Sequence, residues 1–524
     1  MQQVLIAGQW RDAQYVSSFR AVNPATREEL ALEFPVSQWQ DCDEALDAAV
    51  AASQSLRSIS AVQRAEFLEA YATAIEAQAE AIVDMAHLET AYPKETRLAG
   101  GELPRTTDQL RQAATAARSE SWCIATIDTA SGIRSQYGAI GPVAVFGPNN
   151  FPLAFGSISG GDFAAAIAAG NPVIAKANSS HPGTTQLFAQ CALEAAQATG
   201  MPESIIQLIY RTSHEDGERL VADPRLGATG YTGSRDAGLK LKSAADAVGN
   251  PIYLELSSVN PVIILPAAME QRGAEISEEF TSSCLMGTGQ FCTNPGLVVM
   301  LENEHTDPLI AQICNAFDES PVGTLLSAGV EKSLKQNLQV LVDAGAERLA
   351  GHSESDSDRF CQPNTLLKIS AKQFIADPET MQTEAFGNSS LLVVAESIDE
   401  VSQLISCLEG NLTGCIYSAT DGADDDDYDR IAPELQVKVG RLLNDKMPTG
   451  VAVSAAMNHG GPFPATGHPG FTAVGIPGSL LRFAMLQCYD NIRQDRLPTT
   501  LHDSNPNGEM WRCVDGNWTQ GNVS

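Results

Sequence analysis

VAVFGP (143–148) and PVIAKA (172–177) are two short apolar runs separated by a stretch of helical pattern. IIQLIY (205–210) and GATGYTGS (227–234) repeat the arrangement further along the chain. Apolar strands that alternate with helices are typical of βαβ units, in which the strands form a parallel sheet. These four runs therefore predict an α/β unit built on a parallel sheet.

A second set of apolar runs indicates a second α/β unit. Its members are PVIILP (261–266), GLVVML (296–301), SSLLVVA (389–395) and TGCIYS (413–418). A chain of 524 residues is too long for one simple core, and two α/β units in series fit this length. The predicted fold class is therefore α/β.

The segments outside these units carry other patterns. Residues 39–90 have apolar side chains at spacings of three and four, which predicts amphipathic helices over a core. The segment 121–141 alternates like a β-hairpin and is expected to form an arm that reaches a partner subunit. The acidic run DGADDDDYD (421–429) is interpreted as a solvated loop or helix start, since the ligand spacing of a calcium loop is missing. The tail at 502–524 is polar and is expected to lie on the surface.

The composition argues against several classes of protein. With 33 basic and 64 acidic side chains the formal net charge is −31, so most of the surface should repel nucleic acids and anionic membranes. The N-terminus has no signal-peptide pattern, and no window offers about 18 consecutive apolar residues. We therefore interpret the protein as cytoplasmic. The cysteines are scattered singly, without C-x-x-C pairs or zinc-ligand spacing, so we expect neither a disulfide framework nor a metal site.

One cysteine has neighbours of a different kind. Cys292 lies in GTGQFCTNPG (287–296), where glycines let the backbone approach closely and Pro295 suits an irregular turn. An ordinary thiol, with a pKa of about 8.5, is mostly protonated at neutral pH, and backbone amides help to stabilise its thiolate. Cys292 is therefore a candidate nucleophile. The alternative is a structural cysteine in a glycine-rich turn.

Two further segments offer groups that a nucleophilic mechanism needs. FGPNNFPLAFG (146–156) follows a strand, and its Asn150 amide is a candidate donor to a developing oxyanion. The alternative there is an asparagine-rich turn. Glu255 lies inside the apolar run YLELSSVNP (253–261), where burial raises the pKa of a carboxyl and makes it a candidate base toward water. A salt-bridged core glutamate is the alternative.

Two segments have the properties of a nucleotide-phosphate site. YTGSRDAG (231–238) places Gly233 and Ser234 between a strand end and a helix start, where free amides bind phosphate. PVIAKANSSHPGT (172–184) places Lys176 at the end of an apolar strand, where it could bond a ribose or a phosphate. An ordinary helix cap and a surface lysine are the respective alternatives.

In this order and spacing, the five motifs resemble the aldehyde dehydrogenase superfamily from about residue 5 to residue 495. In that family P-x-N-F-P supplies the oxyanion asparagine, E-L within a strand the general base, and G-Q-x-C the nucleophile. T-G-S, a lysine after a strand, and the glutamate of E-x-F-G contact the cofactor. The matching positions are Asn150, Glu255 and Cys292 for catalysis, and Lys176, Gly233, Ser234, Glu384 and Phe386 for cofactor binding.

The resemblance implies a fold, an assembly and a reaction. A Rossmann-type dinucleotide-binding domain would be joined to a second α/β catalytic domain, with a β-arm for assembly into a homodimer or homotetramer. An aldehyde would be oxidised to a carboxylic acid through a thiohemiacetal and a thioester on Cys292, and Glu255 would activate the hydrolytic water. The implied boundaries are 1–120 with 142–255 for the cofactor, 256–475 for catalysis, 121–141 with 476–501 for the arm, and 502–524 for the polar tail.

One position bears on the choice of cofactor. NAD-preferring members of the family carry a glutamate three residues after the lysine, and here that residue is Ser179. A carboxylate there would repel a 2′-phosphate, whereas Ser179 with Lys176 nearby tolerates one. We therefore expect NADP to be preferred over NAD, with Arg211 or His214 as further phosphate contacts.

Within the superfamily, three segments most resemble the NADP-dependent α-ketoglutarate semialdehyde (2,5-dioxopentanoate) dehydrogenase group. They are GELPRTTDQLR (101–111), GQFCTNPG (289–296) and HGGPFPAT (459–466). That group oxidises an aldehyde with a distant carboxylate, so Arg105, Arg111 and Phe155 are candidates for substrate contact. A helix-surface salt bridge is the alternative for either arginine.

Two departures from the group leave other readings open. Ser257 replaces the glycine usual after Glu-Leu, and KANSSHPG (176–183) differs from the usual wording. A broad-specificity or fatty-aldehyde NADP-dependent dehydrogenase is one alternative. Glu255 argues against an enzyme that passes the thioester to coenzyme A. A non-catalytic structural or binding relative is the alternative from a different class, but such a protein needs none of the chemistry that these residues offer.

Overall fold

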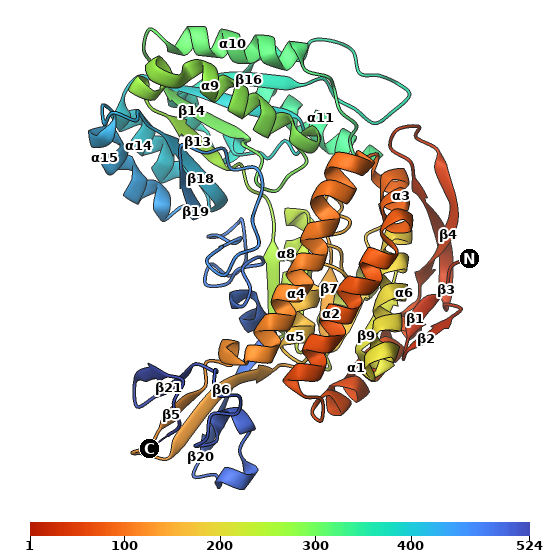
Figure 1. The fold of residues 1–524 in the computed structure, drawn as a ribbon. Helices are drawn as coiled ribbons and strands as arrows, with labels where there is room; N and C mark the ends of the chain where they lie inside the picture. The colour runs from red at the N-terminus through yellow and green to blue at the C-terminus, as the bar shows by residue number, and fades with distance from the viewer. Residues whose placement is uncertain (524) are drawn as a thin grey trace.

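The computed structural model describes residues 1–523, and a seven-stranded sheet with the order β12-β11-β7-β8-β9-β1-β2 forms one half of it (Figure 1). The strands are β1 (Val4–Ile6), β2 (Gln9–Arg11), β7 (Val143–Phe146), β8 (Val173–Lys176), β9 (Ile206–Ile209), β11 (Ala228–Thr232) and β12 (Ile252–Glu255). The strands from β12 to β9 are parallel, and β1 and β2 continue the sheet antiparallel. Every residue of β7 and β9 is buried, which is typical of a sheet covered on both faces. The predicted parallel sheet is therefore present.

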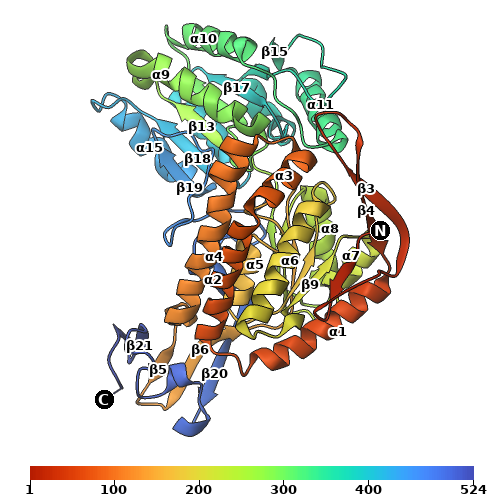
Figure 2. The ribbon, with the colours of Figure 1, turned by 45° about the vertical axis from the view of Figure 1, so that its right-hand side comes forward.

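The helices around this sheet come from the first half of the chain. They are α1 (Trp39–Leu56), α2 (Ala61–Ala77), α3 (Ala79–Thr90), α4 (Leu103–Ser119), α5 (Gly161–Ala168), α6 (Pro182–Thr199), α7 (His214–Val221) and α8 (Arg235–Asp246). A capping box between Ser60 and Gln63 starts α2, and Phe67, Tyr71 and Ile75 form its fully buried face. Figures 1 and 2 show α2 between α4 and α6, with all three running along the sheet.

The second sheet, with the order β15-β16-β17-β14-β13-β18-β19, forms the other half of the molecule (Figure 1). Its strands are β13 (Pro261–Ile264), β14 (Leu297–Leu301), β15 (Glu347–Ala350), β16 (Thr365–Ser370), β17 (Ser389–Ala395), β18 (Asn411–Tyr417) and β19 (Val439–Asn444). All are parallel except β15. The surrounding helices are α9 (Pro266–Leu285), α10 (Thr306–Glu319), α11 (Ala328–Asp343), α12 (Ala371–Ala376), α13 (Pro378–Met381), α14 (Ile398–Cys407) and α15 (Asp425–Gln436). Together the two halves confirm the α/β fold class.

A third sheet, β20-β6-β5-β21-β22, projects from the end of the molecule opposite the second sheet (Figure 1). It contains β5 (Thr126–Asp128), β6 (Ile133–Ala139), β20 (Ala484–Asp490), β21 (Arg512–Val514) and β22 (Asn517–Thr519). The hairpin predicted at 121–141 is formed by β5 and β6. The segment 502–524, expected to be a polar surface tail, contributes β21 and β22, and β21 pairs in parallel with β5. The end of the chain therefore extends this sheet. A smaller sheet joins β3 (Tyr15–Val22), β4 (Glu29–Ser37) and β10 (Arg211–Thr212).

The acidic run 421–429 leads into α15, as predicted, but it is not solvated throughout. Asp424 is 4% exposed, and its carboxylate accepts hydrogen bonds from the amides of Ala267 and Ala268 at 3.0 and 2.9 Å, at the start of α9. This carboxylate thus satisfies amides that the helix itself leaves free.

Within residues 1–523, no helix is long and apolar enough to cross a membrane.

Candidate active site

Cys292 follows an irregular turn whose shape depends on glycine. Gly287, Thr288 and Gly289 have φ angles of 56°, 60° and 66°. A Cβ at Gly289 would collide with the carbonyl oxygen of Gly387, so only glycine fits this position. The turn leads to β14 and leaves Cys292 partly exposed. The glycine-rich composition thus builds a turn that keeps the thiol accessible inside the molecule.

Glu255 ends β12, and its buried carboxylate lies against His459. A bridge between Glu255 and Thr466 brings the segment 459–466 to this strand end. Glu255 Oε1 lies 2.9 Å from His459 Nε2, and Oε2 has no hydrogen-bond partner among residues 1–523. Two lone pairs at 2.9 Å would repel, so a proton lies between Oε1 and Nε2.

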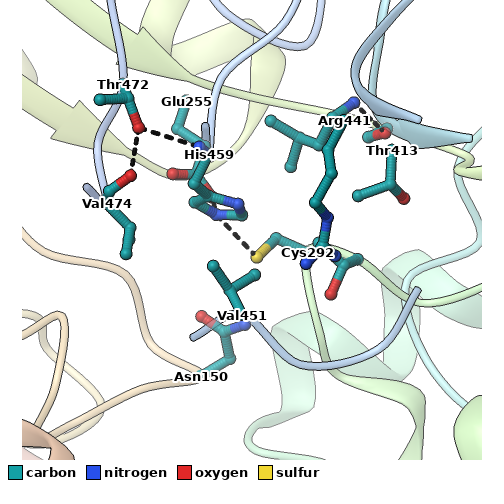
Figure 3. Close-up of polar contacts among 12 residues, drawn as sticks. Asn150, Glu255, Cys292, Thr413, Arg441, Val451, His459, Thr472 and Val474 are labelled. Carbon is teal, nitrogen blue, oxygen red and sulfur yellow. Dashed lines mark hydrogen bonds and ion pairs between the residues drawn. The ribbon is translucent and has the colours of Figure 1, made fainter. Parts of the chain in front are cut away.

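His459 also contacts the candidate nucleophile. Its Nε2 lies 3.4 Å from Cys292 Sγ, and Figure 3 shows the imidazole between this sulfur and the Glu255 carboxylate. The His459 amide donates to Thr472 Oγ1 at 2.9 Å, and its carbonyl accepts from the Ala473 amide at 2.9 Å. His459 was not predicted as a site residue, although it begins HGGPFPAT (459–466), one of the three segments that carry the group resemblance.

Burial and neighbouring groups set the protonation of Cys292 and Glu255. Burial raises the pKa of the Cys292 thiol well above its ordinary value, the Glu255 carboxylate raises it further, and Arg105 opposes them. Burial alone would raise the pKa of Glu255, but the adjacent His459 and the nearby Cys292 thiol outweigh it and hold that pKa below its usual range. The resting site therefore contains an ionised carboxylate and a protonated thiol.

Asn150 is held against the turn that carries Cys292. Its side-chain Nδ2 donates to the Gln290 carbonyl at 2.9 Å. The backbone carbonyl of Asn150 accepts from Tyr92 Oη and Arg97 Nη2 at 3.1 and 3.2 Å. The side chain is buried, and Figure 3 shows it in the same close-up as Cys292, with Val451 between them. The structure thus brings Asn150, Glu255 and Cys292 together from separate segments.

The cationic cofactor candidates lie where β8 and β9 end. Lys176 is the last residue of β8, and Arg211 comes two residues after the end of β9 and begins β10. Burial, with the charge of Arg211, lowers the pKa of Lys176 to about 8. Ser179 lies in the turn that follows Lys176, and His214 is the first residue of α7. Carboxyl ends of parallel strands share one edge of the sheet, so these residues fall on one side of it.

Gly233 and Ser234 connect β11 to α8. A Cβ at Gly233 would lie 2.7 Å from Tyr231 Oη, so the Tyr231 ring would have to move to admit a side chain there. Ser234 is the N-cap residue of α8, but its side chain makes no capping hydrogen bond. The first amides of this helix are therefore not occupied by the serine hydroxyl, which is the arrangement a phosphate group requires.

Glu384 and Phe386 line an open pocket, together with Ser258, Gly289 and Phe291. Burial raises the pKa of Glu384 to about 7. Gly289 and Phe291 come just before Cys292 in the chain, so this pocket extends from the predicted ribose contact to the turn that carries the candidate nucleophile.

Of the three substrate candidates, the structure brings Arg105 and Phe155 to the site. The Arg105 guanidinium lies 5.1 Å above the centroid of the Phe155 ring, and the centroids of the Phe155 and His459 rings are 6.0 Å apart. Arg105 Nη1 donates to the Val451 carbonyl, whereas Nε and Nη2 are buried without a partner in the described part of the chain. Burial lowers the pKa of Arg105, and the nearby Cys292 opposes this effect. The free edge of this guanidinium is thus suited to a carboxylate.

Arg111 does not belong with them. Its side chain is 43% exposed and pairs with Glu76 through two hydrogen bonds of 2.7 and 2.8 Å. The substrate role suggested for Arg111 is therefore replaced by the helix-surface salt bridge, because the guanidinium is already satisfied on the outer face of α4.

Comparison with known proteins places this chain in a family. The family model described as "Aldehyde dehydrogenase family" matches residues 10–461. The chain is 38% identical to alpha-ketoglutaric semialdehyde dehydrogenase 2 of Azospirillum brasilense, over 93% of this chain and 94% of the relative. It is 35% identical to alpha-ketoglutaric semialdehyde dehydrogenase of Acinetobacter baylyi, over 97% of each.

Solved structures share the fold at lower identity. Aldehyde dehydrogenase C of Pseudomonas syringae, solved as a mutant with NAD⁺ and octanal, has a TM-score of 0.80 at 20% identity and covers 95% of this chain and 98% of its own. Lactaldehyde dehydrogenase of Escherichia coli has a TM-score of 0.80 at 22% identity, and the match covers 93% of this chain and 98% of the other. At these identities the likeness concerns the fold.

Proposed function

Since this chain belongs to the aldehyde dehydrogenase family, we propose that it oxidises 2,5-dioxopentanoate (α-ketoglutarate semialdehyde) to 2-oxoglutarate with NADP. The observation that carries the substrate is Arg105, whose Nε and Nη2 have no partner in residues 1–523 although the guanidinium lies near Cys292. A substrate carboxylate would satisfy both N–H groups in a bidentate pair. The names of the two relatives at 38% and 35% identity agree with this substrate.

The chemistry follows from the residues around Cys292. The Cys292 thiol loses its proton to solvent, and the resulting thiolate adds to the aldehyde carbon while the Cys292 amide and Asn150 hold the oxyanion. One N–H of the Asn150 amide is used by the Gln290 carbonyl, and the second remains for the substrate oxygen. Loss of hydride from the same carbon leaves a thioester on Cys292. Glu255 then takes a proton from water, which attacks the thioester and releases the acid and the thiolate.

His459 has a place in this scheme because its Nε2 faces both reacting side chains. A proton at Nε2 serves the Glu255 carboxylate in the resting state, and it also serves the sulfur when the thiolate forms. An N–H directed at a thiolate stabilises it and lowers the pKa of the thiol. His459 thus counteracts the burial that keeps Cys292 protonated.

The cofactor residues fit a dinucleotide with a 2′-phosphate. When bound, NADP supplies the hydride acceptor. Lys176 and Arg211 provide two cations near the end of β8, and Ser179 takes the place of a repelling carboxylate. The free start of α8, directly after Gly233, suits a phosphate. A kcat/KM for NAD that exceeds the value for NADP would contradict the cofactor preference.

One observation favours a second substrate class. Phe151, Ala154 and Phe291 form a small apolar cluster with Phe155 next to the site. Such a lining would accommodate the chain of a fatty aldehyde, so a broad-specificity or fatty-aldehyde dehydrogenase is the second candidate.

A panel of aldehydes separates the two candidates. With NADP as cofactor, we expect kcat/KM to be higher for 2,5-dioxopentanoate than for succinic semialdehyde, glutaraldehyde or long-chain aldehydes. Arg105→Met should lower kcat/KM for the carboxylate-bearing aldehydes by about tenfold to 100-fold, roughly 1.4–3 kcal/mol, and spare glutaraldehyde. Arg111→Met is the matched control, since Arg111 pairs with Glu76 on the surface. A long-chain aldehyde that wins by more than about tenfold would exclude the semialdehyde.

A further inference from the structure

We propose that Cys292 Sγ, His459 Nε2 and a carboxylate oxygen of Glu255 form an inhibitory site for Zn²⁺. The three donor atoms lie within 4.8 Å of one another. Thiolate, imidazole and carboxylate are the three side-chain donors that zinc prefers in proteins. No metal site was predicted from the sequence, because the three ligands lie on three segments with none of the short spacings of a zinc motif.

The distances from His459 Nε2 to the other two donors are close to those of a tetrahedral zinc ion, and the sulfur and the carboxylate oxygen lie within 4.8 Å of each other. Bonds of about 2.0–2.3 Å place neighbouring ligands about 3.3–3.8 Å apart. The distance from Cys292 Sγ to His459 Nε2 is 3.4 Å and already fits. The 2.9 Å between His459 Nε2 and Glu255 Oε1 must widen by a few tenths of an ångström, or Oε2 must take its place.

The unpartnered oxygen of Glu255 is an independent indication of a ligand. Glu255 is 4% exposed, and its Oε2 makes no hydrogen bond within residues 1–523. A buried carboxylate oxygen without a partner is costly. A cation bound between this carboxylate and the sulfur would remove that cost.

The charges of the donors also match a divalent cation. A thiolate, a carboxylate and a neutral imidazole carry two negative charges, which Zn²⁺ neutralises. Binding expels the thiol proton and moves the imidazole proton from Nε2 to Nδ1, so one proton is released per metal ion. Arg105 and Arg441 lie near the sulfur and oppose a cation. With only three protein donors and this opposing charge, the site should be open and reversible rather than structural.

The inhibition rests on the proposed function, because the metal occupies the lone pairs that the thiolate and the base need. The metal binding itself rests only on the donor geometry. We therefore expect Zn²⁺ to compete with the aldehyde, to protect Cys292 from alkylation and to be removed by EDTA. Its affinity should rise about tenfold per pH unit below the pKa of the thiol, since one proton is released.

Cobalt titration of the full-length protein tests the site without relying on turnover. Co²⁺ bound to a thiolate gives a sulfur-to-metal charge-transfer band, and we expect this band in the wild type and its loss in Cys292→Ser. His459→Asn and Glu255→Gln should each weaken the apparent affinity for Co²⁺, and for Zn²⁺ in alkylation protection, by at least about tenfold. The control is Cys488→Ser, which removes an exposed cysteine and should change neither value. Equal metal affinity in the wild type and in both His459→Asn and Glu255→Gln would overturn the site, even if zinc inhibits turnover. Metal binding in a protein that oxidises no aldehyde would instead contradict the proposed function.

Discussion

Cys284 and Cys292 are two thiols from neighbouring segments, and they differ in what surrounds the sulfur. Cys284 lies in the last turns of α9 and is fully buried, with its Sγ 3.5 Å from the Ser389 carbonyl. Burial raises the pKa of Cys284 to about 12. Cys292 lies eight residues later in a glycine-rich turn, where its Sγ is 3.4 Å from His459 Nε2.

The comparison shows that burial raises the pKa of both thiols and so does not by itself predict which thiol reacts. Burial is the main cause of a raised pKa at both cysteines. Only Cys292 has an ionised base, a proton donor and an accessible surface beside it. Reactivity should therefore follow from the neighbours of the sulfur, and changes to those neighbours should make Cys292 behave more like Cys284.

Removal of the nucleophile should have the largest effect. We expect Cys292→Ala to lower kcat for aldehyde oxidation by about 10⁴-fold or more, because no other group near the substrate can form the thioester. NADP binding, measured by fluorescence titration, should remain within about twofold, since the cofactor candidates lie on other segments. Turnover that persists in this variant would refute the covalent mechanism.

Glu255→Gln should separate the two halves of the reaction. The amide cannot activate water, so we expect steady-state kcat to fall by about 10²–10⁴-fold while the first hydride transfer continues. Stopped-flow measurement should then show a burst of about one NADPH per active site. A variant that loses the burst together with the steady state would assign Glu255 to thiolate formation instead.

His459→Asn should make the Cys292 thiol less reactive without removing it. Loss of an N–H directed at the thiolate costs about 1.5 kcal/mol, so the pKa of the thiol should rise by about one unit. A higher pKa leaves less thiolate at a given pH, and iodoacetamide alkylation at pH 7 should slow by about tenfold. The pH profile of the alkylation rate should shift to higher pH by about one pH unit, matching the change in the thiol pKa. His305→Asn, which changes a partly exposed histidine just before α10, is the control. An unchanged profile in His459→Asn would show that the imidazole does not act on the sulfur.

The strands that carry the site could be predicted from the sequence because they are buried on both faces. Each residue of β7 and β9 is apolar or buried, so a continuous apolar run identifies the strand without any tertiary information. The turn before Cys292 could also be predicted, because the segment is rich in glycine. In the structure, Gly287 and Gly289 adopt positive φ. The hairpin of β21 and β22 was not, because short polar strands at the edge of a sheet lack such a run.

Side-chain neighbours could not be predicted in the same way. Arg105 and Arg111 lie six residues apart on α4, which places them about 120° apart around the helix axis. The sequence does not say which of these directions faces the nucleophile. His459 reaches Glu255 only because Thr466 pairs with the end of β12, a contact between residues about 200 positions apart in the chain.

Cys284→Ala should have the smallest effect and completes the comparison. The substitution removes one buried atom from a packed core, so the free energy of unfolding should fall by about 1 kcal/mol, visible as a small decrease in Tm by differential scanning fluorimetry. Since Cys284 meets a backbone carbonyl rather than His459 or Glu255, kcat/KM should stay within about twofold of the wild type. The alkylation rate of Cys292 should also be unchanged. A loss of activity larger than the loss of stability explains would mean that the end of α9 positions the catalytic turn, and that the two thiols are coupled through the backbone between them.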